Sequence, residues 1–278
     1  MKVLKDQPVY YHDGRAITQG DIERALKRSG LGSGDIVMVH SDISSFGKLG
    51  EIMDKDQFLQ SILNCFLNVI GSGGTLLVPT YTYSFCKSAE FDVRNTKSEV
   101  GLFSEFVRNK NGTIRSQDPI FSHAGIGRDA KRILSNIGNV CFGENSVFDQ
   151  LYRLKGKIIN FGKYFDITFL HYIENAFQVS YRFDKSFSGT IIGRSGNRSK
   201  KTFIFYACYF KNGKKTVSYN MGLLADELKR MGLLKKITLG ASHVICSKAE
   251  DCYRVGLEML RKNEFAFLRE KPRALASG

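Results

Sequence analysis

The sequence lacks the features of a metal-binding, secreted or membrane-spanning protein. Its 6 cysteines form no CxxC pair, so a zinc knuckle is not expected and we predict no metal site. No stretch reaches the roughly 18 uninterrupted apolar residues of a membrane helix, and residues 1–6 lack the apolar core of a signal peptide. We therefore expect a soluble, cytoplasmic protein without membrane insertion.

Acidic residues are scarce relative to basic ones. The chain has 41 Lys and Arg against 27 Asp and Glu, which gives a formal net charge of +14. Such a balance favours an anionic partner. Nucleic acid is not the expected one, because the basic residues are not gathered in one block or helix and no nucleic-acid motif is present. A phosphorylated small molecule, such as coenzyme A or a nucleotide sugar, fits the charge equally well, and a merely solvated basic surface is the remaining alternative.

The order of apolar segments in the first half predicts an α/β fold. Residues 36–39 are four consecutive apolar residues between turn signals, which is typical of a strand buried on both faces. Residues 54–70 have helical spacing and end at a glycine-rich turn, and residues 75–80 form a second buried strand. This alternation predicts a three-layer α/β/α sandwich around a mixed, largely parallel sheet.

The second half of the chain is richer in β-type residues. Residues 201–210 are aromatic and β-branched, typical of one strand of an antiparallel hairpin with a turn at residues 211–214. Residues 237–246 predict two short strands around a tight turn, and residues 247–262 predict a final helix. Because no linker or repeat is present, we predict one domain over residues 1–278, with a β-rich insertion at approximately residues 181–246.

One histidine and one glutamate have the spacing of an acid–base pair. The apolar run 157–162 predicts a buried strand, and the residues after it have helical periodicity, so His171 and Glu174 share one helix face. A carboxylate beside an imidazole fixes its tautomer and supports its use as a general base. The alternative is a surface ion pair or a buried structural histidine.

Hydroxyl-rich segments follow the predicted strands. Ligands of open α/β sheets bind at the carboxyl ends of strands, where hydroxyl groups can donate hydrogen bonds to phosphate oxygens. A guanidinium group can hold an oxyanion in a fork that lysine cannot match. The candidates are Ser41, Ser44 and Ser45 after the first strand, and Arg115, Ser116 and Ser122 further along. An ordinary polar turn is the alternative for the first group.

Five segments, taken in order, resemble the antibiotic N-acetyltransferase family, whose founding members are aminoglycoside 3-N-acetyltransferases. They are Gly34-Asp35-Ile36-Val37-Met38-Val39-His40-Ser41, Gly74-Thr75-Leu76-Leu77-Val78-Pro79-Thr80, Arg115-Ser116-Gln117-Asp118-Pro119-Ile120-Phe121-Ser122, Phe142-Gly143-Glu144-Asn145-Ser146 and Thr168-Phe169-Leu170-His171-Tyr172-Ile173-Glu174. The resemblance implies an α/β/α sandwich, acetyl-CoA or another acyl-CoA as the donor, and an amine on a sugar as the acceptor.

The resemblance also implies roles for individual residues. His171 and Glu174 match the catalytic dyad, and Thr80 and Thr168 match threonines near the reaction centre. Ser41 and its loop, with Ser44, Ser45 and Phe46, match the coenzyme contacts. We expect Arg115, Ser116 and Ser122 to contact the phosphates and the pantetheine arm.

The sequence departs from the antibiotic-resistance members at two positions. Asp118 stands where they have histidine, and Asp42 replaces a serine. The segment 81–87 and the motif Asp118-Pro119-Ile120-Phe121-Ser122 resemble a branch that acylates nucleotide-linked amino sugars for bacterial surface polysaccharide. We therefore expect such an acceptor, with Tyr81, Tyr83, Asp118 and Arg182 as substrate contacts. An aminoglycoside is the alternative acceptor.

Two further hypotheses compete with acyl transfer. A non-catalytic protein that binds anions or nucleic acid would use the basic surface, and a Ser–His hydrolase would need a GxSxG elbow that the sequence lacks. Cys86, beside Lys87, is a candidate nucleophile, although a lone cysteine is more often a packing residue. The sequence leaves the oligomeric state open, with a homodimer as one option.

Overall fold

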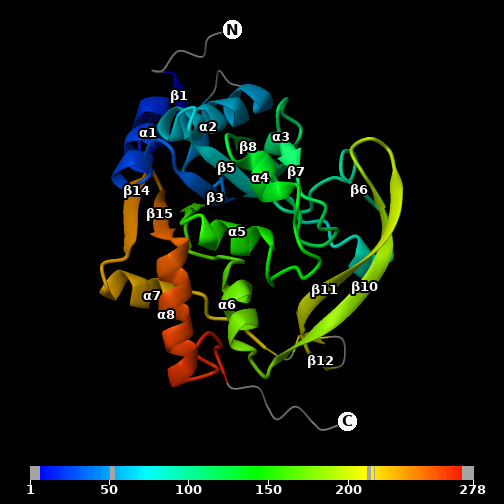
Figure 1. The fold of residues 1–278 in the computed structure, drawn as a ribbon. Helices are drawn as coiled ribbons and strands as arrows, with labels where there is room; N and C mark the ends of the chain where they lie inside the picture. The colour runs from blue at the N-terminus through cyan, green and yellow to red at the C-terminus, as the bar shows by residue number, and fades with distance from the viewer. Residues whose placement is uncertain (1–6, 51–53, 212–213, 216, 271–278) are drawn as a thin grey trace.

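A seven-stranded sheet forms the centre of the molecule, with the strand order β14-β15-β9-β3-β5-β8-β7 (Figure 1). The computed structural model describes residues 7–50, 54–211, 214–215 and 217–270. The strands of the central sheet are β3 (Ile36–Ser41), β5 (Thr75–Pro79), β7 (Ile114–Arg115), β8 (His123–Gly127), β9 (Lys157–Phe161), β14 (Leu234–Leu239) and β15 (Ser242–Lys248).

Parallel pairing is confined to the centre of this sheet. Strand β3 pairs in parallel with β5 on one side and with β9 on the other. The outer strands β15, β14, β8 and β7 join through antiparallel pairs. The sheet is mixed, as expected. Fewer of its strand pairs are parallel than the predicted largely parallel sheet would have.

Helices cover both faces of the sheet, so the three-layer prediction is confirmed. Side chains alternate along β3: Val37 and Val39 join the core on one face, and Met38 joins the core on the other. The helices of the first face are α1 (Gln19–Arg28), α2 (Lys55–Ile70) and α3 (Leu102–Arg108). Those of the second are α4 (Ala130–Leu134), α5 (Val147–Arg153), α6 (Leu170–Phe177) and α8 (Ala249–Lys262), with α7 (Gly222–Arg230) beside β14.

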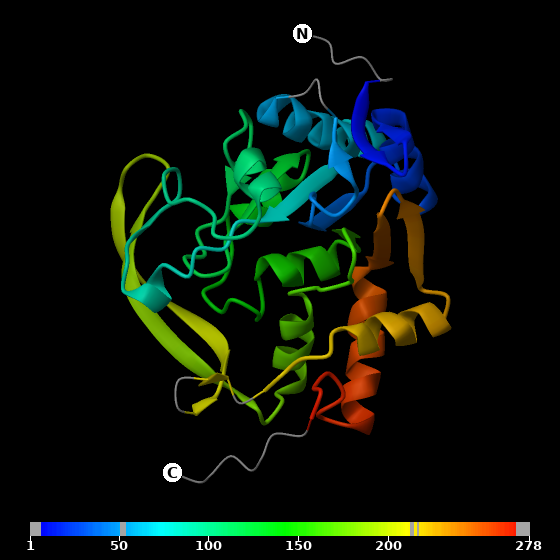
Figure 2. The same cartoon turned by 180° about the vertical axis from the view of Figure 1, so that it is seen from behind.

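A long hairpin extends along one side of the molecule. It consists of β10 (Arg182–Ile192) and β11 (Arg198–Cys208), and β10 also pairs with β6 (Phe91–Asp92). Figures 1 and 2 show it on the side opposite to β14 and β15. The hairpin turns at residues 193–197, and two residues of the predicted turn, 212 and 213, lie outside the described residues.

The segment predicted as a β-rich insertion is divided among three sheets. The β10–β11 hairpin and the short pair β12 (Phe210–Lys211) and β13 (Lys214–Lys215) lie outside the central sheet. Strands β14 and β15, by contrast, extend the central sheet next to β9. Their tight turn is confirmed, because Gly240 has a φ of +56° and a Cβ there would lie 2.4 Å from the Phe46 carbonyl oxygen.

The remaining strands form a small sheet near the start of the chain, in which β1 (Pro8–His12) pairs with β2 (Arg15–Thr18) and with β4 (Lys48–Leu49). Thr18 caps α1 through a capping box with Asp21. A 3-10 turn spans Phe85–Lys87. None of the helices in the described part of the chain is long and apolar enough to cross a lipid bilayer.

Candidate active site

The predicted acid–base pair is formed on α6. The loop after β9 carries the chain from the end of the sheet to this helix, whose first turn contains His171. His171 Nδ1 lies 2.8 Å from Glu174 Oε2, which confirms that the two side chains share one helix face. The imidazole is partly accessible, with a side-chain exposure of 19%, whereas the carboxylate is fully buried. The imidazole can therefore meet a ligand while the carboxylate orients it.

The Glu174 carboxylate is held by three donors. Besides His171, the Tyr181 hydroxyl donates to Oε1 at 2.8 Å and Arg182 Nε lies 2.9 Å from Oε2. Burial raises the pKa of this carboxyl, but the hydrogen bond from His171 and the charge of Arg182 outweigh burial, so its pKa falls below the ordinary value. Glu174 is therefore ionised at neutral pH.

Arg182 has a different role from the substrate contact predicted from the sequence. Its side chain is only 3% exposed, and it pairs with Glu174. It also donates to the Tyr206 carbonyl oxygen at 2.6 Å and to the Tyr219 hydroxyl at 2.9 Å. Because these partners occupy the guanidinium, it cannot reach out to a diphosphate. The sequence could not show this, since the partners come from β11 and from the segment before α7.

An aromatic wall, made of Phe142, Phe121, Phe205, Tyr81 and Tyr83, leads away from His171. The Phe142 ring lies 5.4 Å from the imidazole and 4.6 Å from Phe121. Phe121 in turn contacts Phe205, Tyr81 and Tyr83 at ring distances of 5.0, 5.1 and 5.4 Å. Ring contacts thus connect the predicted contacts Tyr81 and Tyr83 to His171. Tyr83 and Phe205 are half-buried, and the other three rings are buried.

Thr168 and Tyr81 connect this wall to the start of α6. Their side chains are hydrogen-bonded to each other, and the Thr168 carbonyl oxygen accepts the His171 N–H at 3.0 Å. The Tyr81 hydroxyl also lies 3.5 Å from Nε2 of the buried His123. Thr168 is therefore bonded to the backbone of His171, and its role near the reaction centre stays a prediction.

Thr80 and the predicted phosphate contacts around Arg115 are buried instead. Arg115 donates to the carbonyl oxygens of Thr80 and Thr96 at 2.8 and 2.6 Å, and its Nε lies 3.2 Å from the hydroxyls of Thr80 and Ser122. Ser116 is fully buried and accepts the His123 N–H. This cluster ties the ends of β5, β7 and β8 together, so its polar groups are bonded within the fold, and the coenzyme role of Arg115, Ser116 and Ser122 stays a prediction. A sequence motif cannot show whether a polar group is already bonded within the fold.

Asp118 and Phe46 also differ from their predicted roles. Asp118 is buried, and its Oδ1 accepts the N–H groups of Ile120 and Phe121 at 2.8 Å each, so it stabilises a turn rather than contacting a substrate. Phe46 is fully buried and stacks on Phe161 at 4.1 Å, so it is a core residue rather than a coenzyme contact.

Cys86 is a poor candidate for a nucleophile. It is half-buried, and burial, reinforced by the nearby charge of Asp118, raises the pKa of its thiol to about 11. Because the thiolate is the nucleophilic form, little of it is present at neutral pH.

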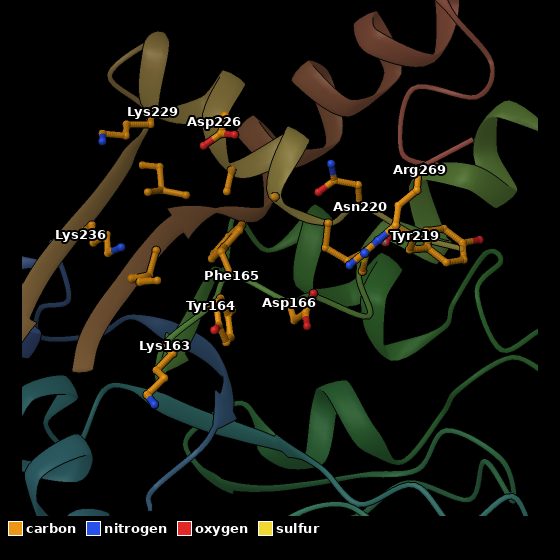
Figure 3. A pocket seen from close by; sticks show the side chains of 15 residues that line it. Lys163, Tyr164, Phe165, Asp166, Tyr219, Asn220, Asp226, Lys229, Lys236 and Arg269 are labelled. Carbon is orange, nitrogen blue, oxygen red and sulfur yellow. Dashed lines mark hydrogen bonds between the residues drawn. The ribbon is translucent and has the colours of Figure 1, made fainter. Parts of the chain in front are cut away.

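A cavity of about 620 Å³ lies next to Tyr219. Figure 3 shows Lys229 and Lys236 on one side of it, Tyr219 and Arg269 on the opposite side, and Phe165 between them. The four cations of the lining outnumber its two carboxylates, Asp166 and Asp226, so the cavity suits a phosphorylated ligand. Tyr219 belongs to both sites, since its ring also lies 5.5 Å from His171.

A second cavity, of about 210 Å³, continues the first along the ends of β3 and β9. Lys163, Tyr164 and Asp166 line both cavities, and His40 and Ser41 line the second. The structure therefore places Ser41 where a coenzyme contact is predicted.

Ser44 and Ser45 belong to the turn that follows β3. Ser44 Oγ donates to Asp42 Oδ1 at 2.7 Å, and Ser45 Oγ lies 2.8 Å from Ser242 Oγ. These bonds hold the turn against the start of β15. Both serines follow Ser41 closely along the chain, but neither is among the described residues that line the second cavity.

A comparison with known protein families identifies the family of this chain. The family model described as aminoglycoside 3-N-acetyltransferase matches residues 38–261. The chain belongs to this family. Membership makes it an N-acetyltransferase, and its co-substrate is acetyl-CoA.

Relatives of the family share the fold along most of their length. The chain is 23% identical, over 88% of its own length and 92% of the relative's, to aminoglycoside N(3)-acetyltransferase III from Salmonella sp. The crystal structure of aminoglycoside acetyltransferase AAC(3)-Xa superposes with a TM-score of 0.75 at 22% identity, covering 91% of this chain and 95% of that one. The structure of AAC-IIIb in a binary complex with CoASH superposes with a TM-score of 0.73 at 21% identity, covering 92% and 99%.

Proposed function

We propose that the protein transfers the acetyl group of acetyl-CoA to an amino group of an aminoglycoside. The observation that carries this proposal is that the His171 imidazole contacts both Phe142 of the aromatic wall, at 5.4 Å, and Tyr219 of the lysine-rimmed cavity, at 5.5 Å. The cavity offers cations for a coenzyme, and the half-buried rings of Tyr83 and Phe205 offer faces for a sugar. The base therefore lies where the two substrates would meet.

The cavity residues fit coenzyme A in chemistry. Lys163, Lys229 and Lys236 supply ammonium donors for phosphate oxygens, and Ser41 supplies a hydroxyl at the end of β3. Tyr219 marks the end of the cavity nearest to His171. We propose that the coenzyme enters past the lysines and presents its thioester beside Tyr219.

In the proposed reaction, His171 acts as the general base. The amine attacks the thioester carbon, the N–C bond forms as the C–S bond breaks, and the amine proton passes to the imidazole and then to the departing sulfur. Glu174 stabilises the imidazolium that forms, and such assistance is typically worth about 10²–10⁴-fold in rate. The Thr168 hydroxyl is our candidate donor to the thioester oxygen as negative charge develops there.

The proposal that the acceptor is an aminoglycoside rests on what the relatives are described as acting on or binding. Aminoglycoside N(3)-acetyltransferase is the name of the Salmonella relative, and AAC-VIa, which has a similar fold, is described as bound to sisomicin. Aromatic faces such as Tyr83 and Phe205 can pack against the apolar face of a sugar ring.

One observation favours a second candidate, a nucleotide-linked amino sugar. The carboxylates that act on Tyr81 and Tyr83 are already paired: Asp118 caps a turn, and Glu99 lies 2.5 and 2.6 Å from Lys87 Nζ. A polycationic aminoglycoside needs acidic partners, whereas a diphosphate suits a chain with a net charge of +14.

Thiol release separates the two candidates. The protein is incubated with acetyl-CoA and either an aminoglycoside panel or a panel of nucleotide-linked amino sugars, with His171→Ala as the inactive control. Release with aminoglycosides alone supports the proposal, and release with nucleotide sugars alone replaces it with the second candidate. No release with either panel contradicts both.

A further inference from the structure

Arg182 contacts the imidazole of His171 as well as the carboxylate of Glu174. Its Nη2 atom is 2.8 Å from His171 Nδ1 and 3.3 Å from Nε2. An atom at these distances from both ring nitrogens would overlap Cε1 if it lay in the ring plane, so Nη2 must lie above the ring. The guanidinium thus meets the face of the imidazole and leaves the in-plane direction of Nδ1 to Glu174.

This arrangement selects one tautomer of His171. Nδ1 has a single in-plane site, which holds either a proton or a lone pair. The Glu174 carboxylate, 2.8 Å away, is ionised and only accepts hydrogen bonds, so Nδ1 carries the proton. Nε2 is then the basic nitrogen, which is the form that a general base requires.

The same arrangement opposes protonation of the His171 ring, because the imidazolium would be a second positive charge beside that of Arg182. Arg182 already compensates the buried charge of Glu174, so an imidazolium gains less from that carboxylate than it would alone. The guanidinium also lies directly against the ring. The other titratable groups around the pair are three tyrosines, Tyr181, Tyr206 and Tyr219, and the thiol of Cys208. The pKa values of the three tyrosines are raised, first by burial, so they stay neutral.

We propose that Arg182 is a positioning residue that keeps His171 neutral and Nδ1-protonated between turnovers, and so sets the lowest pH at which the enzyme works. This inference rests on the proposed function, in which His171 takes the proton of the amine. No acceptor contact is needed for it, because Arg182 acts through Glu174 and the imidazole ring.

The test compares Arg182→Gln with Arg115→Gln as a matched control. Both remove a buried guanidinium with several protein partners, but only Arg182 touches the dyad. Two curves are measured for each variant: the ring-nitrogen NMR titration of His171, assigned with His171→Asn, and the pH profile of kcat/KM. In Arg182→Gln, His171 should take up its proton about 1 pH unit higher or more, and the acid limb of the profile should move with it.

Arg115→Gln should lower the unfolding midpoint and leave both curves in place. Equal shifts in the two variants, or no shift in Arg182→Gln, would overturn the proposal. If Arg182→Gln does not fold, Glu174→Gln provides the second measurement, because removing the carboxylate leaves Arg182 to oppose protonation alone. His171 should then titrate at lower pH than in the wild type, and an unchanged or higher value would count against the proposal.

The NMR titration needs no substrate. An enzyme that is inactive on every acceptor therefore contradicts the proposed function, while the titration of His171 still decides the role of Arg182.

Discussion

Replacing Glu174 by Gln tests the buried pair most directly. The substitution keeps the shape of the side chain but removes the charge opposite Arg182, whose side chain is only 3% exposed. Breaking a buried ion pair by removing one partner costs about 3–5 kcal/mol, because the other charge is left uncompensated. The amide oxygen still accepts one hydrogen bond, so we expect the lower end of that range, near 3 kcal/mol.

This loss is large enough to measure in two ways. Urea unfolding followed by circular dichroism should give the difference in the free energy of unfolding. In a protein of this size, each kcal/mol lowers the melting temperature by roughly 2–4 °C, so the midpoint should fall by on the order of 10 °C. Turnover, followed by thiol release, should fall by about 10²–10⁴-fold, since the imidazole loses its orienting carboxylate.

A double variant supplies the control. If the loss comes from the uncompensated guanidinium, Glu174→Gln combined with Arg182→Gln should be more stable than the sum of the single changes predicts, by about 1 kcal/mol or more. A Glu174→Gln protein within about 1 kcal/mol of the wild type, or strictly additive effects, would refute the reasoning.

Three further predictions follow from the site. His171→Ala should abolish turnover while coenzyme A binding, measured by calorimetry, stays nearly unchanged; unchanged turnover would contradict the role of the imidazole. Lys229→Ala combined with Lys236→Ala should weaken coenzyme A binding about tenfold or more, through lost charge-assisted hydrogen bonds, and should make the affinity less dependent on salt; an unchanged affinity would place the phosphates elsewhere. Because the folded-state pKa of Glu174 lies below its ordinary value of 4.5, its contribution to stability is present above about pH 4.5 and is lost as the pH falls through the folded value. Acid unfolding should therefore be less pH-dependent in Glu174→Gln, and identical pH dependence would show that the carboxylate is not stabilised by folding.

The sequence alone determined the elements whose signals are local. The spacing of apolar residues marked α2, β3 and β5, because burial on the sheet repeats with the period of each element. The same rule placed His171 and Glu174 on one face of α6, since only three residues separate them. Five short motifs were enough to indicate the family, which the match over residues 38–261 then confirmed.

Only the tertiary structure decided which polar residues are available to a ligand. The sequence presents both Arg115 and Arg182 as ligand contacts, yet one ties three strands together and the other compensates Glu174. The lysine-rimmed cavity combines residues from the loop after β9, from α7 and from β14, which no sequence window contains together. The physical reason is that a buried charge must be paired, and the fold supplies the partners from segments that are distant in sequence. The role of such a residue therefore depends on tertiary contacts.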